Sequence, residues 1–192
     1  MINLTNIDNK NSQNKRLVMI LGMHRSGTSL ITRGLKIFGV ELGNNLMPPQ
    51  ESNPKGFYED LDINALDMEM LKAIEMDWDD VAPIEKTHIE ILKNKGFLLR
   101  AAGVITEKMR HADIFGIKDP AASKLLPLWN EAFEYLGIDV SYIIIIRNPL
   151  SIADSLEKSY LMWLVHIMPA LIETIGKKSY RRLRQSFGIH RK

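Results

Sequence analysis

The sequence predicts an α/β fold in which helices cover both faces of a parallel sheet, giving three layers. Apolar runs of strand length, at 16–22 and 140–146, alternate with segments of helical periodicity, and this alternation is typical of a parallel sheet with crossover helices. A glycine-bearing loop joins the first run to the first helical segment. The length of 192 residues suits one domain with a core of its own.

The first half of the chain supplies one strand and several helices. Residues 16–22 (RLVMILG) are continuously apolar, as expected for a strand buried on both faces. Residues 28–38 have apolar side chains at helical spacing, and the following Gly39 is suited to end a helix in a left-handed turn. Residues 61–76 and 88–109 also have helical periodicity.

Two local patterns refine this half. Thr87 and Glu90 have the spacing of a capping box, which predicts that the helix over 88–109 begins there. Residues 41–58 hold three prolines and several asparagines and are predicted to form a long loop. Long loops in compact domains are often functional.

The second half contains two further strands. Residues 114–118 are a short strand candidate, followed by a helix that runs to about Leu136 and ends at Gly137. Residues 140–146 (VSYIIII) have the strongest strand pattern, because four isoleucines follow one another. A further helix begins near Pro149, since proline suits a first helical turn.

The two ends of the chain differ from the predicted domain over 16–176. Residues 1–15 are rich in Asn and Lys and have no apolar core like that of a signal peptide, so we expect a disordered lead-in. Residues 177–192 contain seven Lys or Arg and no acid, although the net charge of the chain is only +2. Such a basic tail can bind nucleic acid, anionic lipid or a phosphorylated ligand, or it can simply be solvated.

Composition excludes several classes of protein. Without cysteine, the chain has no disulfide framework, thiolate nucleophile or Cys-ligated metal. The five histidines are scattered and form no HExxH pair, so we expect no metal. The longest apolar stretch, 161–172, is shorter than the roughly 20 residues that span a bilayer. We therefore expect a cytoplasmic protein without a transmembrane segment or a nucleic-acid partner, whose membrane contact, if any, would run through the basic tail.

The loop GMHRSGTS at 22–29 is the strongest functional pattern. Its place between a strand and a helix points backbone N–H groups and the positive end of the helix dipole at one spot. Gly22 and Gly27 allow the tight turn and the close approach of an anion. Thr28 and Ser29 add hydroxyl donors, so the loop predicts a phosphate-binding site.

The glycine spacing matches a Walker A loop, but Thr28 stands where that loop has lysine. A cation, Arg25, lies inside the loop instead, between His24 and Ser26. A P-loop kinase or NTPase that uses ATP with Mg²⁺ is therefore an alternative. Asp119 supports that alternative, because an acid after a predicted strand resembles a metal-organising aspartate.

A second pattern ends the isoleucine strand, where Arg147 is followed eight positions later by Ser155. A nucleotide hydrolase would typically have an aspartate at such a strand end. A guanidinium cannot bind a metal, but it can grip a phosphate through two parallel hydrogen bonds. Ligands of open parallel sheets gather at the carboxyl ends of the strands, so Arg147 is predicted to bind phosphate near the loop.

Together these patterns, with N-P-K-G-F-Y-E at 53–59 and K-D-P at 118–120, resemble the PAPS-dependent sulfotransferases of the bacterial and tyrosylprotein-like branch. PAPS is 3′-phosphoadenosine 5′-phosphosulfate. The resemblance covers about residues 17–155 and implies a P-loop NTPase-like sulfotransferase core. It implies transfer of a sulfuryl group from PAPS to a hydroxyl acceptor without a metal. The residues implied to bind PAPS are Gly22, Arg25, Ser26, Gly27, Thr28 and Ser29 at the 5′ end, and Arg147 and Ser155 at the 3′ phosphate.

The resemblance also implies catalytic roles. Glu59 is the first choice for the base that deprotonates the acceptor, with His24 as the second. Arg25 and the loop amides would stabilise charge on the bridging oxygen, and Lys118 would contact the transferring group. An alternative is that Glu59 and Asp60 merely begin the next helix, where its dipole favours acids.

After residue 155 the resemblance fades, and the family's late glycine-rich 3′-phosphate segment has no counterpart. A truncated nucleotide-binding module without turnover is therefore a further alternative. The acceptor stays open between carbohydrate, lipid-linked glycan, peptide tyrosine and small metabolite. Tryptophan can stack on a sugar, but a buried core role is expected for at least two of Trp78, Trp129 and Trp163. Gap-filling in the core is expected for Met68, Met70 and Met76.

Overall fold

The structure is a computed structural model that describes residues 15–50, 53–80 and 82–157. The chain divides into two compact units, Met1–Arg147 and Asn148–Lys192. Residues 1–14 of the predicted lead-in, the apolar segment 161–172 with Trp163, and the predicted basic tail lie outside the described residues. The predicted domain limits of 16 and 176 therefore stay predictions.

The first unit contains a parallel sheet of three strands. β1 (Arg16–Leu21) lies between β2 (Ile114–Lys118) and β3 (Asp139–Ile144) and pairs in parallel with both. The register sets Ile20 of β1 beside Lys118 on one side and Ile143 on the other. All three strands consequently end at the same edge of the sheet. The predicted α/β class with a parallel sheet is confirmed.

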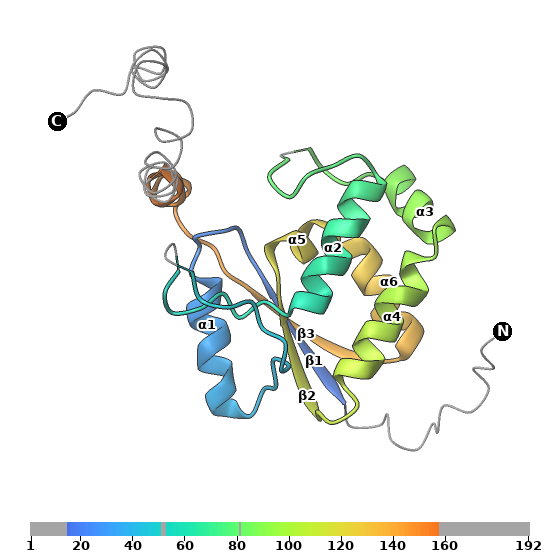
Figure 1. Ribbon diagram of the computed structural model, residues 1–192, viewed down its shortest axis with the longest axis horizontal. Coiled ribbons are helices and arrows are strands. Elements are labelled where there is room, and N and C mark those ends of the chain that lie inside the picture. The colour runs from blue at the N-terminus through green and yellow to red at the C-terminus, as the bar shows by residue number, and fades with distance from the viewer. Residues whose placement is uncertain (1–14, 51–52, 81, 158–192) are drawn as a thin grey trace, which may run out of the picture. The chain divides into compact units, whose positions relative to one another are not determined.

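Helices cover both faces of this sheet. Between β1 and β2 come α1 (Thr28–Leu35), the 3-10 helix η1 (Lys36–Phe38), α2 (Leu61–Ala73), α3 (Lys86–Asn94) and α4 (Phe97–Lys108). Between β2 and β3 come α5 (Pro120–Lys124) and α6 (Leu126–Leu136). Figure 1 shows α1 on one side of the strands and α2, α4 and α6 on the other. Among the described residues, no helix has the length and apolar character needed to cross a membrane.

Each face of the sheet has its own apolar packing. Leu17 and Met19 of β1 belong to one buried cluster that includes Trp129 of α6. On the opposite face, Val40 and Leu42 approach β2 so closely that a Cβ on Gly116 would meet a side-chain carbon of each at 2.8 Å. Glycine in the middle of this strand therefore allows the segment after η1 to pack on the sheet.

Two helix ends predicted from glycines are confirmed, whereas a third glycine that separates two helices was not predicted. Gly39 and Gly137 cap η1 and α6 with φ of 79° and 64°, as predicted. The single helix predicted over 88–109 was wrong, because Gly96 takes φ of 82° and separates α3 from α4. The helix predicted up to Leu136 is likewise two helices, α5 and α6.

The predicted capping box was also wrong. α3 begins at Lys86, one residue before Thr87. The backbone N–H of Glu85 donates to Nδ1 of His88 at 3.1 Å. The same reciprocal principle thus operates two residues upstream, with an imidazole in place of the usual Glu or Gln.

Candidate functional site

The predicted phosphate loop forms a tight turn at the carboxyl end of β1. The backbone N–H and the hydroxyl of Ser26 both donate to the carbonyl of Met23, at 3.2 and 2.6 Å. Gly27 caps the N-terminus of α1 with φ of 102°, in the left-handed region. The first N–H groups of a helix have no partners within the helix. The loop therefore delivers the positive end of α1 to the edge where the strands end.

Arg25 has an unusual backbone for a residue with a side chain, with φ of 64°. A left-handed conformation costs a non-glycine residue about 1–2 kcal/mol. Such outliers persist where the surrounding structure fixes them, and they cluster at ligand-binding sites. The Arg25 carbonyl is held by Nη1 of Arg147 at 2.7 Å, so a contact from the end of another strand supports this turn.

Gly22 lies where there is no room for a side chain. A Cβ at this position would meet Cγ2 of Thr28 at 2.9 Å and the backbone oxygen of Ile145 at 3.0 Å. The Gly22 N–H also donates to Oγ of Ser123 in α5, at 3.4 Å. The start of the loop therefore packs directly against the chain after β3 and is tied to the chain after β2.

The strand ends bring two predicted cations to this loop. Lys118 is the last residue of β2, and Arg147 follows β3. Because β1 lies between these strands, the loop after β1 is flanked by both. Ser155 lies in the second unit, within the helical residues 149–157. The structure thus brings Arg147 to the loop and describes Ser155 on a separate unit.

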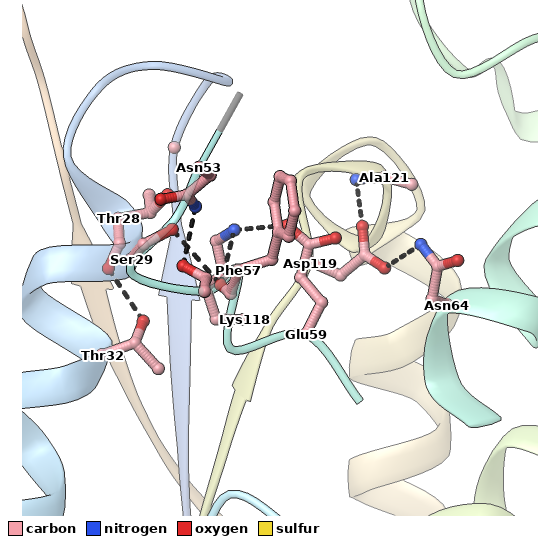
Figure 2. Close-up of polar contacts among 12 residues, drawn as sticks. Thr28, Ser29, Thr32, Asn53, Phe57, Glu59, Asn64, Lys118, Asp119 and Ala121 are labelled. Carbon is pink, nitrogen blue, oxygen red and sulfur yellow. Dashed lines mark hydrogen bonds and ion pairs between the residues drawn. The ribbon is translucent and has the colours of Figure 1, made fainter. Parts of the chain in front are cut away.

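Glu59 and Lys118 form a buried ion pair beside the loop (Figure 2). Oε1 of Glu59 accepts from Nζ of Lys118, and the two side chains are only 7% and 4% exposed. Burial raises the pKa of Glu59, and the charge and hydrogen bond of Lys118 oppose this rise. Lys118 therefore favours the ionised form of a carboxylate that burial alone would favour in its neutral form.

One carbonyl joins this pair to the phosphate loop. The Phe57 oxygen accepts from Nζ of Lys118 at 3.3 Å and from Oγ of Ser29 at 3.2 Å, as Figure 2 shows. The Phe57 backbone is presented by a turn in which Nδ2 of Asn53 donates to the carbonyl of Gly56 at 2.6 Å. The N-P-K-G-F-Y-E segment is thus a structural partner of the loop, although the two are about 30 residues apart in sequence.

Glu59 and Asp60 have different tasks, although they are neighbours. Asp60 is the N-cap of α2 and accepts from the N–H groups of Asp62 and Ile63, at 3.0 and 3.3 Å. Its Oδ2 pairs with Nζ of Lys108 at 2.7 Å. The predicted alternative, that both acids merely begin the helix, fits Asp60, whereas Glu59 pairs with Lys118.

Asp119 is engaged by protein donors. Its Oδ1 accepts from the N–H of Ala121 at 2.8 Å, which caps α5, and its Oδ2 accepts from Nδ2 of Asn64 at 2.8 Å. Figure 2 shows both contacts. Burial raises the pKa of Asp119, and these hydrogen bonds oppose the rise. The residue that suggested a metal-organising aspartate therefore serves as a helix cap.

A second buried acid, Asp67 of α2, was not singled out from the sequence. Its side chain is fully buried, and Oδ1 accepts from Nε1 of Trp129 at 2.8 Å. Oδ2 has no hydrogen-bond partner among the residues that the structure describes. Burial raises the pKa of Asp67 well above its usual range, and the nearby Asp119 charge adds to the rise. The sequence does not predict this burial, because an acidic residue in a helix is normally exposed to solvent.

His24 is held neutral inside the loop. Its pKa is lowered to about 4 by burial and by the positive charges of Lys118, Arg25 and Lys124. Its ring meets the edge of Trp78 with 5.0 Å between the centroids and an interplanar angle of 69°. At neutral pH the imidazole therefore carries no charge in a region of positive potential, which is the kind of field that attracts an anion.

The tryptophans and methionines for which a core role was predicted differ in how deeply they are buried. Trp129 is fully buried in the main cluster, whereas Trp78 is 43% exposed. Met70 is fully buried, while Met68 and Met76 are only partly buried. The core role predicted for the methionines is thus complete only for Met70.

The chain matches no protein-family model, no curated protein and no solved structure.

Proposed function

We propose that this protein is a sulfotransferase that moves a sulfuryl group from PAPS to a hydroxyl acceptor. The observation that carries the proposal is the glycine loop at the start of α1, flanked by Lys118 and by Arg147, whose guanidinium contacts the loop backbone at 2.7 Å. A guanidinium has five N–H donors. Arg147 can therefore hold the loop and an anion together, and it supplies the cation for the 3′ phosphate.

Each group of the site has a role in this reaction. The acceptor oxygen attacks sulfur, a new O–S bond forms, and the bond between sulfur and the 5′-phosphate oxygen breaks. That oxygen leaves with the electron pair as part of 3′-phosphoadenosine 5′-phosphate. The loop amides and Arg25 stabilise this growing negative charge. The acceptor proton goes to a base within reach of the hydroxyl.

Glu59 is the proposed base, and its ion pair with Lys118 supports the assignment. Burial alone would favour the neutral acid, which cannot accept a proton. The ammonium of Lys118 opposes that effect and favours the ionised form. Neutral His24 is the second candidate, because its pKa of about 4 leaves it unprotonated and able to accept. An in-line arrangement of acceptor, sulfur and leaving oxygen supplies the remaining rate enhancement.

A thermal-shift comparison tests the ligand class. A ligand that binds only the folded state raises the midpoint of unfolding. We expect 3′-phosphoadenosine 5′-phosphate to raise it in EDTA, and ATP with Mg²⁺ to have a smaller effect. A larger shift with ATP and Mg²⁺ would favour the P-loop kinase or NTPase alternative. Transfer of ³⁵S-labelled sulfate from PAPS to a hydroxyl compound then separates an enzyme from a module that only binds.

A further inference from the structure

Helix α1 has its polar and apolar sides reversed relative to an ordinary helix on a sheet. Thr28 and Thr32 are 4% and 0% exposed, and the hydroxyl of Thr32 donates to the Thr28 carbonyl at 2.8 Å. Leu30, in contrast, is 72% exposed. A helix that packs on a sheet normally turns its apolar side inward and its polar side to solvent. The apolar side chains at helical spacing in this segment therefore do not all belong to the core.

Two more exposed apolar side chains follow on η1. Ile37 and Phe38 are 85% and 78% exposed. Leu30 and Ile37 are seven positions apart, about two helical turns, so they lie on the same side of the segment. α1 contacts β1 and β2, and Figure 1 shows it on the opposite side of the strands from α2, α4 and α6. We call Leu30, Ile37 and Phe38 the α1 patch.

The charge beside the α1 patch is positive. Arg33 and Lys36 are exposed residues of the same segment, and the sequence has no acidic residue from 16 to 40. The next acid is Glu41, whose backbone N–H is bound by the carbonyl of Ile114 at 2.9 Å. Long basic side chains can cover an apolar surface with their stems and keep their charge at its polar border. The segment thus combines large apolar side chains with flanking cations.

This combination fits the surface of an anionic membrane better than a protein partner. Helices that bind in the membrane interface have residues such as Phe and Leu on one side and Lys or Arg beside them. The apolar side chains enter the boundary between head groups and acyl chains, and the cations meet anionic lipid. A specific protein partner needs about 20–30 residues on each side, with charge depleted at the centre. A lipid surface requires no complementary shape and can be reached by a few projecting side chains.

We propose that the α1 patch anchors this protein to the surface of an anionic membrane. Leu30, Ile37 and Phe38 enter the lipid, and Arg33 and Lys36 pair with lipid phosphates. Because α1 begins at the phosphate loop, this anchor also holds that loop near the membrane surface. The proposal stands on the exposed side chains and the charge of the segment, and it does not depend on the sulfotransferase proposal.

A fluorescent label at one position tests which part of the chain enters the lipid. The chain has no cysteine, so Phe38→Cys offers a single site for the environment-sensitive fluorophore nitrobenzoxadiazole. We expect vesicles that contain phosphatidylglycerol to raise its emission and shift it to shorter wavelength, and vesicles of phosphatidylcholine alone to have a smaller effect. Leu99→Cys is the matched control. Leu99 is 56% exposed on α4, on the other side of the strands, and its label should not respond.

Sedimentation with the same vesicles measures what each kind of side chain contributes in the unlabelled protein. Leu30→Ser with Ile37→Ser should weaken binding by roughly tenfold, because less apolar surface leaves water. Arg33→Gln with Lys36→Gln should weaken binding to the anionic vesicles by roughly tenfold, and added salt should reduce this difference. All four side chains are exposed, so the thermal unfolding midpoints of both variants should match that of the wild type.

The outcomes separate the membrane from other partners. Absence of wild-type binding to the anionic vesicles would overturn the proposal. Binding without a response of the label at position 38, or without a loss in the two double variants, would also overturn it and assign the binding to another part of the chain, such as the basic residues 177–192. If Leu30→Ser with Ile37→Ser leaves vesicle binding unchanged but dissociates an oligomer in analytical ultracentrifugation, the patch is a protein interface and the membrane proposal is wrong.

Discussion

Replacement of Lys118 by methionine tests the buried pair beside the phosphate loop. The variant keeps a side chain of similar length but removes the ammonium that pairs with Glu59. Because the two side chains are only 4% and 7% exposed, the Glu59 carboxylate would be left buried without a partner and without water to solvate it. Removing one partner of a buried ion pair costs about 3–5 kcal/mol. We expect the free energy of unfolding at neutral pH to fall by that amount, and Tm to fall by roughly 6–20 °C.

The size of this loss should depend on pH. Burial raises the pKa of Glu59 in the folded protein and Lys118 lowers it, so the pKa of Glu59 in Lys118→Met is higher than in the wild type. A raised folded-state pKa gives a contribution to stability that is present below the unfolded pKa and is lost as pH rises through the folded pKa. The variant should therefore recover part of its stability as pH falls from neutral toward the ordinary Glu pKa of 4.5.

Urea unfolding followed by circular dichroism measures both effects. The double variant Glu59→Gln with Lys118→Met should be more stable than Lys118→Met alone, because no unpaired carboxylate remains. Lys93→Met is the control; it breaks an exposed pair with Glu131 at 2.5 Å and should cost less than about 1 kcal/mol. A similarly small loss for Lys118→Met, or the same loss at neutral and at acidic pH, would refute this reasoning.

Three further predictions concern the groups around the loop. In an NMR titration, the His24 imidazole should have a pKa of about 4. Stability that His24 contributes above its ordinary pKa of 6.5 should be lost as pH falls toward the lowered value, and a titration midpoint near 6.5 would contradict the buried, positive setting. Asp67→Asn should gain stability relative to the wild type as pH rises, since the raised pKa of Asp67 makes its ionisation unfavourable. Chemical unfolding at several pH values measures this gain, and parallel stability profiles of the two proteins would contradict the prediction. Gly22→Ala should lower the free energy of unfolding by about 1–3 kcal/mol through overpacking. Gly27→Ala should lower it by about 1–2 kcal/mol through its left-handed backbone alone, because its Cβ meets no described atom within 4 Å. A Gly22→Ala variant that unfolds at the same urea concentration as the wild type would contradict the packing.

Local signals were sufficient for the elements that carry the loop. The apolar run at 16–22 and the isoleucine run both became strands, and helix α1 begins at Thr28 directly after the second loop glycine. Parallel strands end at one edge of a sheet, so the approach of Arg147 to the loop follows from topology. Gly39 and Gly137 marked two helix ends, but Gly96 was missed because the apolar periodicity continues across it.

Contacts set by packing could not be predicted from the sequence. Glu59 and Lys118 are 59 positions apart, and the sequence predicts only separate roles for them, as a base and as a contact to the transferring group. Asp67 of α2 and Trp129 of α6 meet only because both helices contribute to the main buried cluster. The contact between His24 and Trp78 depends on the anchoring of a loop by Lys124. No local pattern encodes such pairs, since they depend on how elements far apart in sequence pack together.

Calorimetry in EDTA with 3′-phosphoadenosine 5′-phosphate and adenosine 5′-phosphate, on the wild type and on Arg147→Ala, tests the sulfotransferase proposal most directly. The wild type should prefer the ligand with the 3′ phosphate, and Arg147→Ala should lose about 1.5–3 kcal/mol of that binding, as for a charge-assisted hydrogen-bonding partner. Arg100→Ala, at a residue that pairs with Glu69 on the surface at 2.7 Å, should retain the preference. Equal affinity of the wild type for the two nucleotides, or an undiminished preference in Arg147→Ala, would contradict the assignment of the 3′ phosphate to Arg147.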